Sequence, residues 1–168
     1  MSFLFIATLA ACGGEETKPV EPPKVEEVKP VEPPPAPTPP PSAPAPTGPY
    51  TPDEFAAKAI EAAKAAGADT KPNPKAGDAA AIAAGKAQYE KCTTCHGASG
   101  AGDGIAGAAL PQKPAQFTWN ERWDATSVGT KQWIIMNGVS GTSMAPLGLS
   151  EDQAWEVLAY IDGELRKK

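Results

Sequence analysis

The residues best suited to chemistry are Cys92, Cys95 and His96, which follow one another in the order C-x-x-C-H. Two thiols three positions apart lie on one side of a helical turn, where both can add to the vinyl groups of a haem. The histidine faces the same way, so that its Nε2 can bind the iron while its Nδ1–H needs an acceptor to fix the tautomer. No other histidine is present in the sequence. The motif therefore predicts one covalently attached haem c, with iron bound to His96.

Two other interpretations of the cysteine pair are weaker. A thioredoxin-like redox motif belongs in a βαβ setting, whereas the flanks of this pair are rich in alanine and glycine. Half of a zinc site would need a second pair of ligands, and Cys12 is the only other cysteine in the sequence.

The elements that must position this motif are helices. A helix over about 79–91, capped by Asp78, leads into the motif and carries Gly85 where another helix can cross closely. A third helix is predicted over about 127–136, and a capping box at Ser150 opens the last helix. No segment alternates strictly enough to be a strand. We expect an all-α fold, with about three to four helices wrapped around one haem.

Further motifs follow along residues 76–168. They are Gly100-x-Gly102-Asp103-Gly104, Leu110-Pro111, Asn137-Gly138, Met144-x-Pro146 and a Trp-bearing last helix. Together with C-x-x-C-H, this order resembles a class I, monohaem cytochrome c domain of the bacterial kind. The resemblance implies a class I cytochrome c fold over 76–168 whose first and last helices cross near Gly85 and Tyr160.

The resemblance also implies a second axial ligand on the loop before the last helix. Met144 lies in such a loop, whereas Met136 falls within a predicted helix and is expected to be a packing residue. We therefore assign Met144 as the second iron ligand. By the same resemblance, Leu110 or Pro111 supplies the carbonyl that accepts from His96 Nδ1–H.

Aromatic and basic side chains that could meet the haem propionates follow the glycine-rich loop. They are Trp119, Arg122, Trp123 and Lys131. The tryptophans can equally be core or rim residues, and the cations can equally be solvated surface residues.

The N-terminal residues predict a membrane anchor. Residues 2–11 form an apolar run that is too short to span a bilayer as a helix and suits the core of a signal peptide. Leu9-Ala10-Ala11-Cys12 resembles the lipobox of bacterial lipoproteins, although no Lys or Arg precedes the run. We expect residues 1–11 to be a signal peptide and Cys12 to be the lipidated mature N-terminus, on the periplasmic side of a bacterial membrane. The other interpretation is a free thiol in a disordered tail.

A proline-rich segment separates Cys12 from the rest. Of the 20 prolines in the chain, 14 fall between Pro19 and Pro49, which predicts a disordered linker over 12–50. The capping box Thr51-Pro52-Asp53-Glu54 then opens a short helix that stops at Gly67, within a helix-and-linker segment over 51–75. The sequence leaves open whether this helix docks on the haem domain. A net charge of −5 without any basic run argues against a nucleic-acid partner.

These features predict a tethered c-type cytochrome that passes single electrons between respiratory-chain partners and is not itself an enzyme. The expected partners are a terminal oxidase, a quinol-oxidising complex or another cytochrome, because an iron with two protein ligands has no free position for a small-molecule substrate. The alternative is a haem-based sensor or a peroxidase-like centre, either of which needs a labile sixth ligand.

Overall fold

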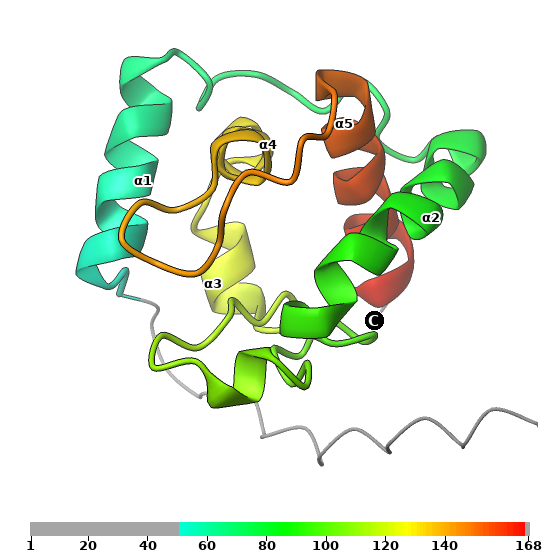
Figure 1. Cartoon of the computed structure of the whole chain (residues 1–168). Coiled ribbons are helices and arrows are strands. Elements are labelled where there is room, and N and C mark those ends of the chain that lie inside the picture. Colours follow the sequence, from blue (N-terminus) through cyan, green and yellow to red (C-terminus); the bar gives the residue numbers. More distant parts are fainter. Residues whose placement is uncertain (1–50, 167–168) are drawn as a thin grey trace, which may run out of the picture. The chain divides into compact units, whose positions relative to one another are not determined.

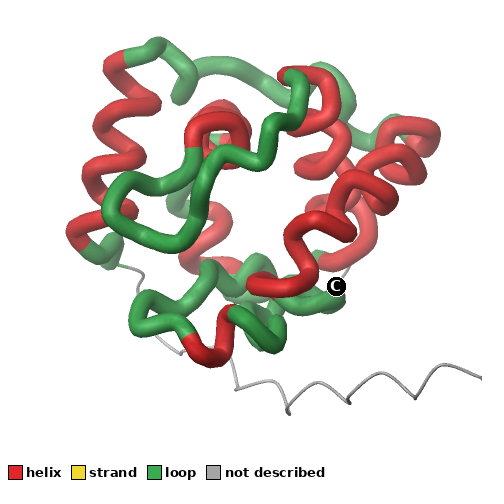
Figure 2. Tube along the Cα trace, viewed as in Figure 1, coloured by secondary structure: helices red, strands yellow, loops and turns green. Residues whose placement is uncertain are grey.

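The computed structural model describes residues 51–166, and these residues form helices and loops without a strand (Figure 1, Figure 2). The α-helices are α1 (Glu54–Ala65), α2 (Ala79–His96), α3 (Asn120–Asp124), α4 (Val128–Asn137) and α5 (Glu151–Tyr160). A 3₁₀ turn, η1 (Gly107–Ala109), and a π-helical turn, η2 (Ile161–Leu165), complete the elements. The predicted all-α fold is confirmed. Cys12, the apolar run before it and the proline-rich segment lie outside the described residues.

Helices α2 and α5 cross each other on the side of the fold opposite α1 (Figure 1). Gly85 makes the crossing possible, because a Cβ there would overlap the Glu156 carbonyl and lie 2.9 Å from Tyr160 Cβ. The crossing predicted from the sequence is confirmed. The buried core built around it consists of Tyr89, Trp123, Leu149, Trp155, Val157, Leu158, Tyr160 and Ile161.

Helix α2 is longer than the sequence predicts. Asp78 caps it as expected, accepting two backbone N–H groups of the first turn at 2.8 and 3.1 Å. The helix does not end near Lys91 but continues to His96, and it stops because Gly97 takes a φ of +79°. The whole attachment motif is therefore helical, which places its three functional side chains on one side of the last turns.

Helix α1 packs on α4, which answers the question that the sequence left open. Ala59 and Ala63 are buried on α1, so the two helices approach closely. After α1 the carbonyl of Ala68 lies where a side chain on Gly129 of α4 would be. Small residues on both sides thus join α1 to the rest of the described chain.

The caps of the other helices follow the sequence with one correction. The capping box of Ser150 and Gln153 opens α5 as predicted, and Ser127 caps α4. The first helix begins at Glu54 with Asp53 as its N-cap, not with Thr51, because the Asp53 carboxylate accepts the first free N–H groups. No helix among residues 51–166 is both long enough and apolar enough to cross a membrane.

Helix α3 was not predicted. It has five residues, no side-chain cap at Trp119 and too few turns to show a periodic pattern. Its buried residue is Trp123, whose Nε1–H donates to Asp162 Oδ1 at 2.8 Å. Burial of the Trp123 side chain against η2 therefore stabilises α3, which the local sequence does not predict.

Candidate functional site

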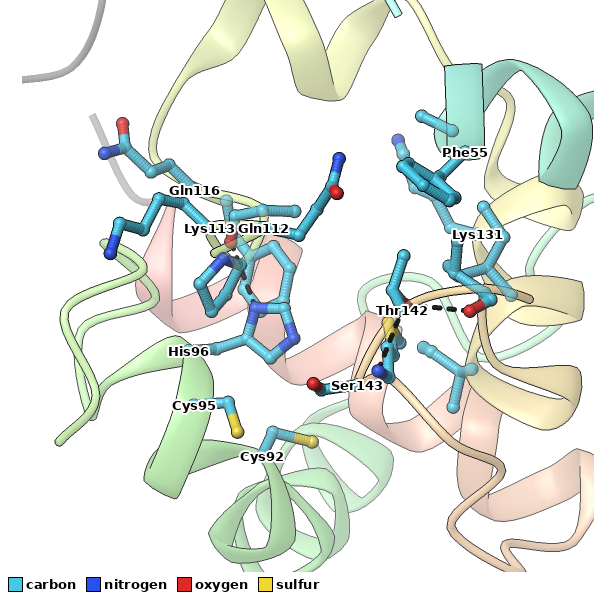
Figure 3. A pocket seen from close by; sticks show the side chains of 18 of the residues that line it. Phe55, Cys92, Cys95, His96, Gln112, Lys113, Gln116, Lys131, Thr142 and Ser143 are labelled. Atoms are coloured by element: carbon cyan, nitrogen blue, oxygen red, sulfur yellow. Dashed lines mark hydrogen bonds between the residues drawn. The ribbon is translucent and has the colours of Figure 1, made fainter. Parts of the chain in front are cut away.

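An apolar cavity of about 230 Å³ brings together the four residues predicted to hold a haem. Cys92, Cys95 and His96 line it from the last turns of α2, and Met144 lines it from the loop between α4 and α5. In Figure 3 the two cysteines and His96 lie on one side, and the loop that carries Ser143 lies across from His96. The large aliphatic and aromatic side chains that also line it are Phe55, Ile60, Leu110, Phe117, Trp123, Ile134, Ile135, Val139, Leu147, Val157, Leu158 and Ile161.

The His96 ring is fixed in one orientation. The side chain is 8% exposed, its Nδ1 lies 3.0 Å from the Ala115 carbonyl oxygen, and its ring stacks on Phe117 with centroids 4.6 Å apart. Burial lowers the pKa of His96, so the neutral imidazole is favoured. Because a carbonyl can only accept, Nδ1 carries the proton and the lone pair of Nε2 is available to a metal.

The predicted acceptor for His96 was wrong. The sequence pointed to the carbonyl of Leu110 or Pro111, whereas the acceptor is the Ala115 carbonyl. Pro111 is exposed and lines a second, polar cavity of about 320 Å³. It therefore has no role in orienting the histidine.

The packing of Pro114 explains this shift along the loop. A Cβ on Gly107 would lie 2.7 Å from Pro114 Cγ, and a Cβ on Gly102 would lie 3.0 Å from the Pro114 carbonyl oxygen. Pro114 thus fills the space that two glycines leave open. The next carbonyl along the chain, that of Ala115, then meets the histidine.

Cys92 and Cys95 form no disulfide, and both line the cavity wall. Burial, and to a smaller extent the nearby Cys95, raises the pKa of the Cys92 thiol to about 11, so the thiol is protonated near neutral pH before it is attached to haem. Both side chains are half-buried. Two unpaired thiols on one helical face are what thioether attachment of a flat macrocycle requires.

The Met144 loop is held in a compact shape. The Val139 N–H donates to the Met144 carbonyl at 2.8 Å, and the Met144 N–H donates to Thr142 Oγ1 at 3.1 Å. Gly138 has a φ of +71°, and a Cβ there would overlap the Met144 carbonyl oxygen. This glycine lets the loop turn back tightly beside the end of α4.

The structure separates the two candidate methionines. Met144 lines the cavity, whereas Met136 lies on α4 and is not among the lining residues. Both side chains are half-buried. The geometry therefore favours Met144 as the residue that can reach a bound iron.

The four propionate candidates lie in different surroundings. Arg122, Trp123 and Lys131 line the main cavity, whereas Trp119 and Arg122 line the second, polar one. Lys131 Nζ lies 4.1 Å from the centre of the buried Trp123 ring, and burial lowers the pKa of Lys131 to about 8. Trp123 is a core residue, one of the two alternatives that the sequence left open. Propionate contacts of the other three stay a prediction.

A comparison with known protein families agrees with this site. Residues 82–163 match the family model for Cytochrome c. These residues form a cytochrome c domain. Such a domain carries covalently bound haem c with its iron, which confirms the predicted cofactor.

One solved structure and the curated proteins complete the comparison. A chain of a reducing HAO-like protein complex from Kuenenia stuttgartiensis is 28% identical, with a TM-score of 0.45. The alignment covers 51% of this chain and 44% of that chain, so this protein spans less than half of that chain's length. No curated protein matches the sequence.

The residues of the cytochrome c domain fit haem c in several independent ways. An imidazole nitrogen and a thioether sulfur are both axial ligands that haem iron accepts. Gln116 Oε1, which the sequence analysis missed, is buried in the cavity wall and has no hydrogen-bond partner in the described part of the chain. An unpartnered buried amide is costly, and the Gln116 amide turned over would present its Nε2–H groups as donors to a carboxylate such as a haem propionate. Residues 51–166 hold no cluster of three or more histidines, cysteines and carboxylates for a different metal centre.

Proposed function

We propose that this protein transfers single electrons between redox proteins through a haem c whose iron is bound by His96 and Met144. One observation carries the proposal: both residues line the same apolar cavity as the two cysteines of the attachment motif. Thioether bonds from Cys92 and Cys95 would hold the macrocycle at the end of α2. With His96 and Met144 as its iron ligands, the bound haem would supply one-electron chemistry and would offer no site to a substrate.

The surrounding residues would tune the haem rather than react. The Ala115 carbonyl keeps His96 Nε2 aimed into the cavity, which strengthens the ligand. The apolar lining excludes water, and methionine in place of a second histidine raises the reduction potential. The chain's own part in the reaction is therefore to bind, to orient and to keep the site dry.

The proposed partners are redox proteins of a respiratory chain. We propose a terminal oxidase, a quinol-oxidising complex or another cytochrome, which accords with the general role of a cytochrome c domain. Residues 76–168 carry 8 basic and 10 acidic side chains, a net charge of −2. A weakly charged domain without a basic surface run does not require a strongly acidic partner.

Carbon monoxide tests the proposed coordination. The reduced full-length protein should titrate as a one-electron centre and should not bind carbon monoxide, because His96 and Met144 would both be bound to the iron. A sensor or peroxidase-like centre has an open or labile sixth position and would bind the gas readily. Rapid formation of a carbon monoxide complex by the unaltered protein would therefore contradict the proposal and favour that alternative.

We further propose that lipidated Cys12 anchors the domain to a membrane, on the periplasmic side of a bacterial envelope. The support is the apolar run that ends at Cys12 and the proline-rich segment over 12–50. Confinement near the membrane raises the local concentration of the domain to the order of millimolar. An exported Cys12→Ser form should therefore be soluble, with an unchanged spectrum and potential, and should turn over a membrane-bound partner much more slowly.

The turnover assay also separates a tethered shuttle from a subunit of a stable complex. Excess soluble Cys12→Ser protein should restore the rate if the anchor acts through concentration. Full turnover at ordinary concentration would show that docking affinity holds the partners together and that the anchor has no such role.

A further inference from the structure

Helix α1 reaches the haem cavity from the side of the Met144 loop, although it lies outside the residues that match the cytochrome c family. The match begins at residue 82, whereas the cavity is also lined by Phe55, Ala56 and Ile60 of α1. We propose that α1 is a strap that holds the Met144 loop against the haem, and that Phe55 is its positioning residue. The inference rests on the proposed ligation by Met144.

The contact between strap and loop is made by the Phe55 ring and Gly141. A Cβ on Gly141 would lie 2.7 Å from Phe55 Cε1 and 3.0 Å from Phe55 Cδ1, so the ring occupies the place of a side chain at 141. Gly141 also has a φ of +82°, which favours glycine. In Figure 3 the Phe55 ring comes from α1 and lies on the same side of the cavity as Thr142, across from His96.

The loop depends on this packing because its hydrogen bonds are internal. Within the described part of the chain, every hydrogen bond of residues 139–147 joins two residues of that segment. They fix the shape of the turn around Thr142 but do not fix its distance from α2 and His96. Apolar contacts must set that distance, and the Phe55 ring supplies one of them.

The strap is itself anchored, so Phe55 does not move freely with the loop. Ala59 and Ala63 of α1 are buried, and the Ala68 carbonyl packs against Gly129 of α4. At the other end the Asp53 carboxylate accepts the backbone N–H of Phe55 at 3.0 Å, which fixes the first turn. Phe55 is therefore held from α4 and pressed against the loop that carries the ligand.

The test measures how readily imidazole replaces the methionine in the oxidised full-length holoprotein. Phe55→Ala should speed imidazole binding about tenfold, equivalent to roughly 1.4 kcal/mol of lost loop packing, and should lower the reduction potential. Phe55→Leu keeps an apolar side chain against Gly141 and should restore both values towards the unaltered protein. Ala62→Gly is the matched control, because Ala62 is exposed on α1, so the change weakens the helix by about 1 kcal/mol without touching the loop or the contact with α4. It should lower the melting temperature and leave the imidazole rate unchanged.

A double-mutant cycle adds a readout of direct contact. Gly141→Ala should loosen the loop through its positive φ and through overlap with the Phe55 ring. Phe55→Ala relieves only the overlap, so the combined variant should bind imidazole more slowly than the two single effects predict. If the effects of the two substitutions on the imidazole rate are additive, the Phe55 ring and the loop do not act on each other, and the proposed role of α1 is wrong.

The outcomes distinguish this inference from the proposed function. If the unaltered protein shows methionine ligation but Phe55→Ala binds imidazole at the same rate, the strap is wrong and the ligand assignment stands. If Ala62→Gly accelerates binding as much as Phe55→Ala, general loosening of α1 explains the effect and the specific role of Phe55 is overturned. If the unaltered protein shows no methionine ligation, the proposed coordination fails and the strap fails with it.

Discussion

Replacing Gly85 by alanine tests the packing on which the haem domain is built. Gly85 lies where α2 crosses α5, and a Cβ at this position would meet backbone atoms of Glu156 as well as Tyr160 Cβ. Alanine has the better helix propensity, so propensity alone predicts that the variant is more stable. The crossing predicts the opposite.

The structure gives the size of the effect. The new Cβ would lie 2.5 Å from the Glu156 carbonyl carbon, whereas ordinary contact begins at 3.4 Å, a shortfall of 3.4 − 2.5 = 0.9 Å. Backbone atoms cannot rotate away, so the helices must separate, at a cost near the upper end of overpacking, about 3 kcal/mol. The gain in propensity offsets about 1 kcal/mol. We expect the free energy of unfolding to fall by about 2 kcal/mol.

Urea unfolding of the full-length holoprotein, followed by far-ultraviolet circular dichroism, measures this change. The midpoint should fall while the slope with urea stays the same, because the exposed surface on unfolding is unaltered. Gly163→Ala is the matched control, since its Cβ meets only the flexible end of Ile82, at 2.7 Å from Cδ1. It should cost less than about 1 kcal/mol. A Gly85→Ala protein as stable as the unaltered one would refute the reasoning.

Two further predictions concern the attachment helix. Tyr89 O–H donates to the buried Gly97 carbonyl at 2.8 Å, so Tyr89→Phe should cost about 1–3 kcal/mol of unfolding free energy. Burial also raises the pKa of Tyr89, so the unaltered protein should lose stability above about pH 10, where the tyrosine of the unfolded chain ionises first. This loss of stability should be smaller in Tyr89→Phe. If urea unfolding gives the two proteins the same dependence of stability on pH, Tyr89 does not cause the loss. Replacing both Cys92 and Cys95 by alanine should abolish the covalent haem adduct in the mass spectrum and much of the helical circular dichroism, and a retained adduct would contradict the attachment site.

The attachment site was predictable because its chemistry is local. The spacing of two cysteines and a histidine within one helix fixes their common side without any knowledge of the fold. The place of Met144 in the cavity wall was also within reach of sequence reasoning, since a glycine-bounded loop can bend towards the attachment motif; its ligation of iron stays a prediction. Gly85 could be placed at the crossing because glycine destabilises the interior of a helix, so its presence there indicates close packing against another helix.

The features that sequence reasoning missed depend on long-range packing. The acceptor for His96 is the Ala115 carbonyl because Pro114 fills the space beside two glycines. The sequence alone does not show which carbonyl of this loop lies next to the histidine. The docking of α1 depends on Gly129 receiving the Ala68 carbonyl, a contact between segments about 60 residues apart (129 − 68 = 61). Phe55 gave no signal of its own, because one aromatic residue on an alanine-rich helix is a weak pattern.

Ligation by Met144 is the central claim, and the spectrum of the oxidised holoprotein tests it most directly. The unaltered protein and Met136→Ala should both show the absorption band that methionine ligation gives to oxidised haem, although Met136→Ala loses packing on α4. Met144→Ala should lose that band, acquire a lower reduction potential and bind carbon monoxide when reduced. A band that survives in Met144→Ala and disappears in Met136→Ala would contradict the account.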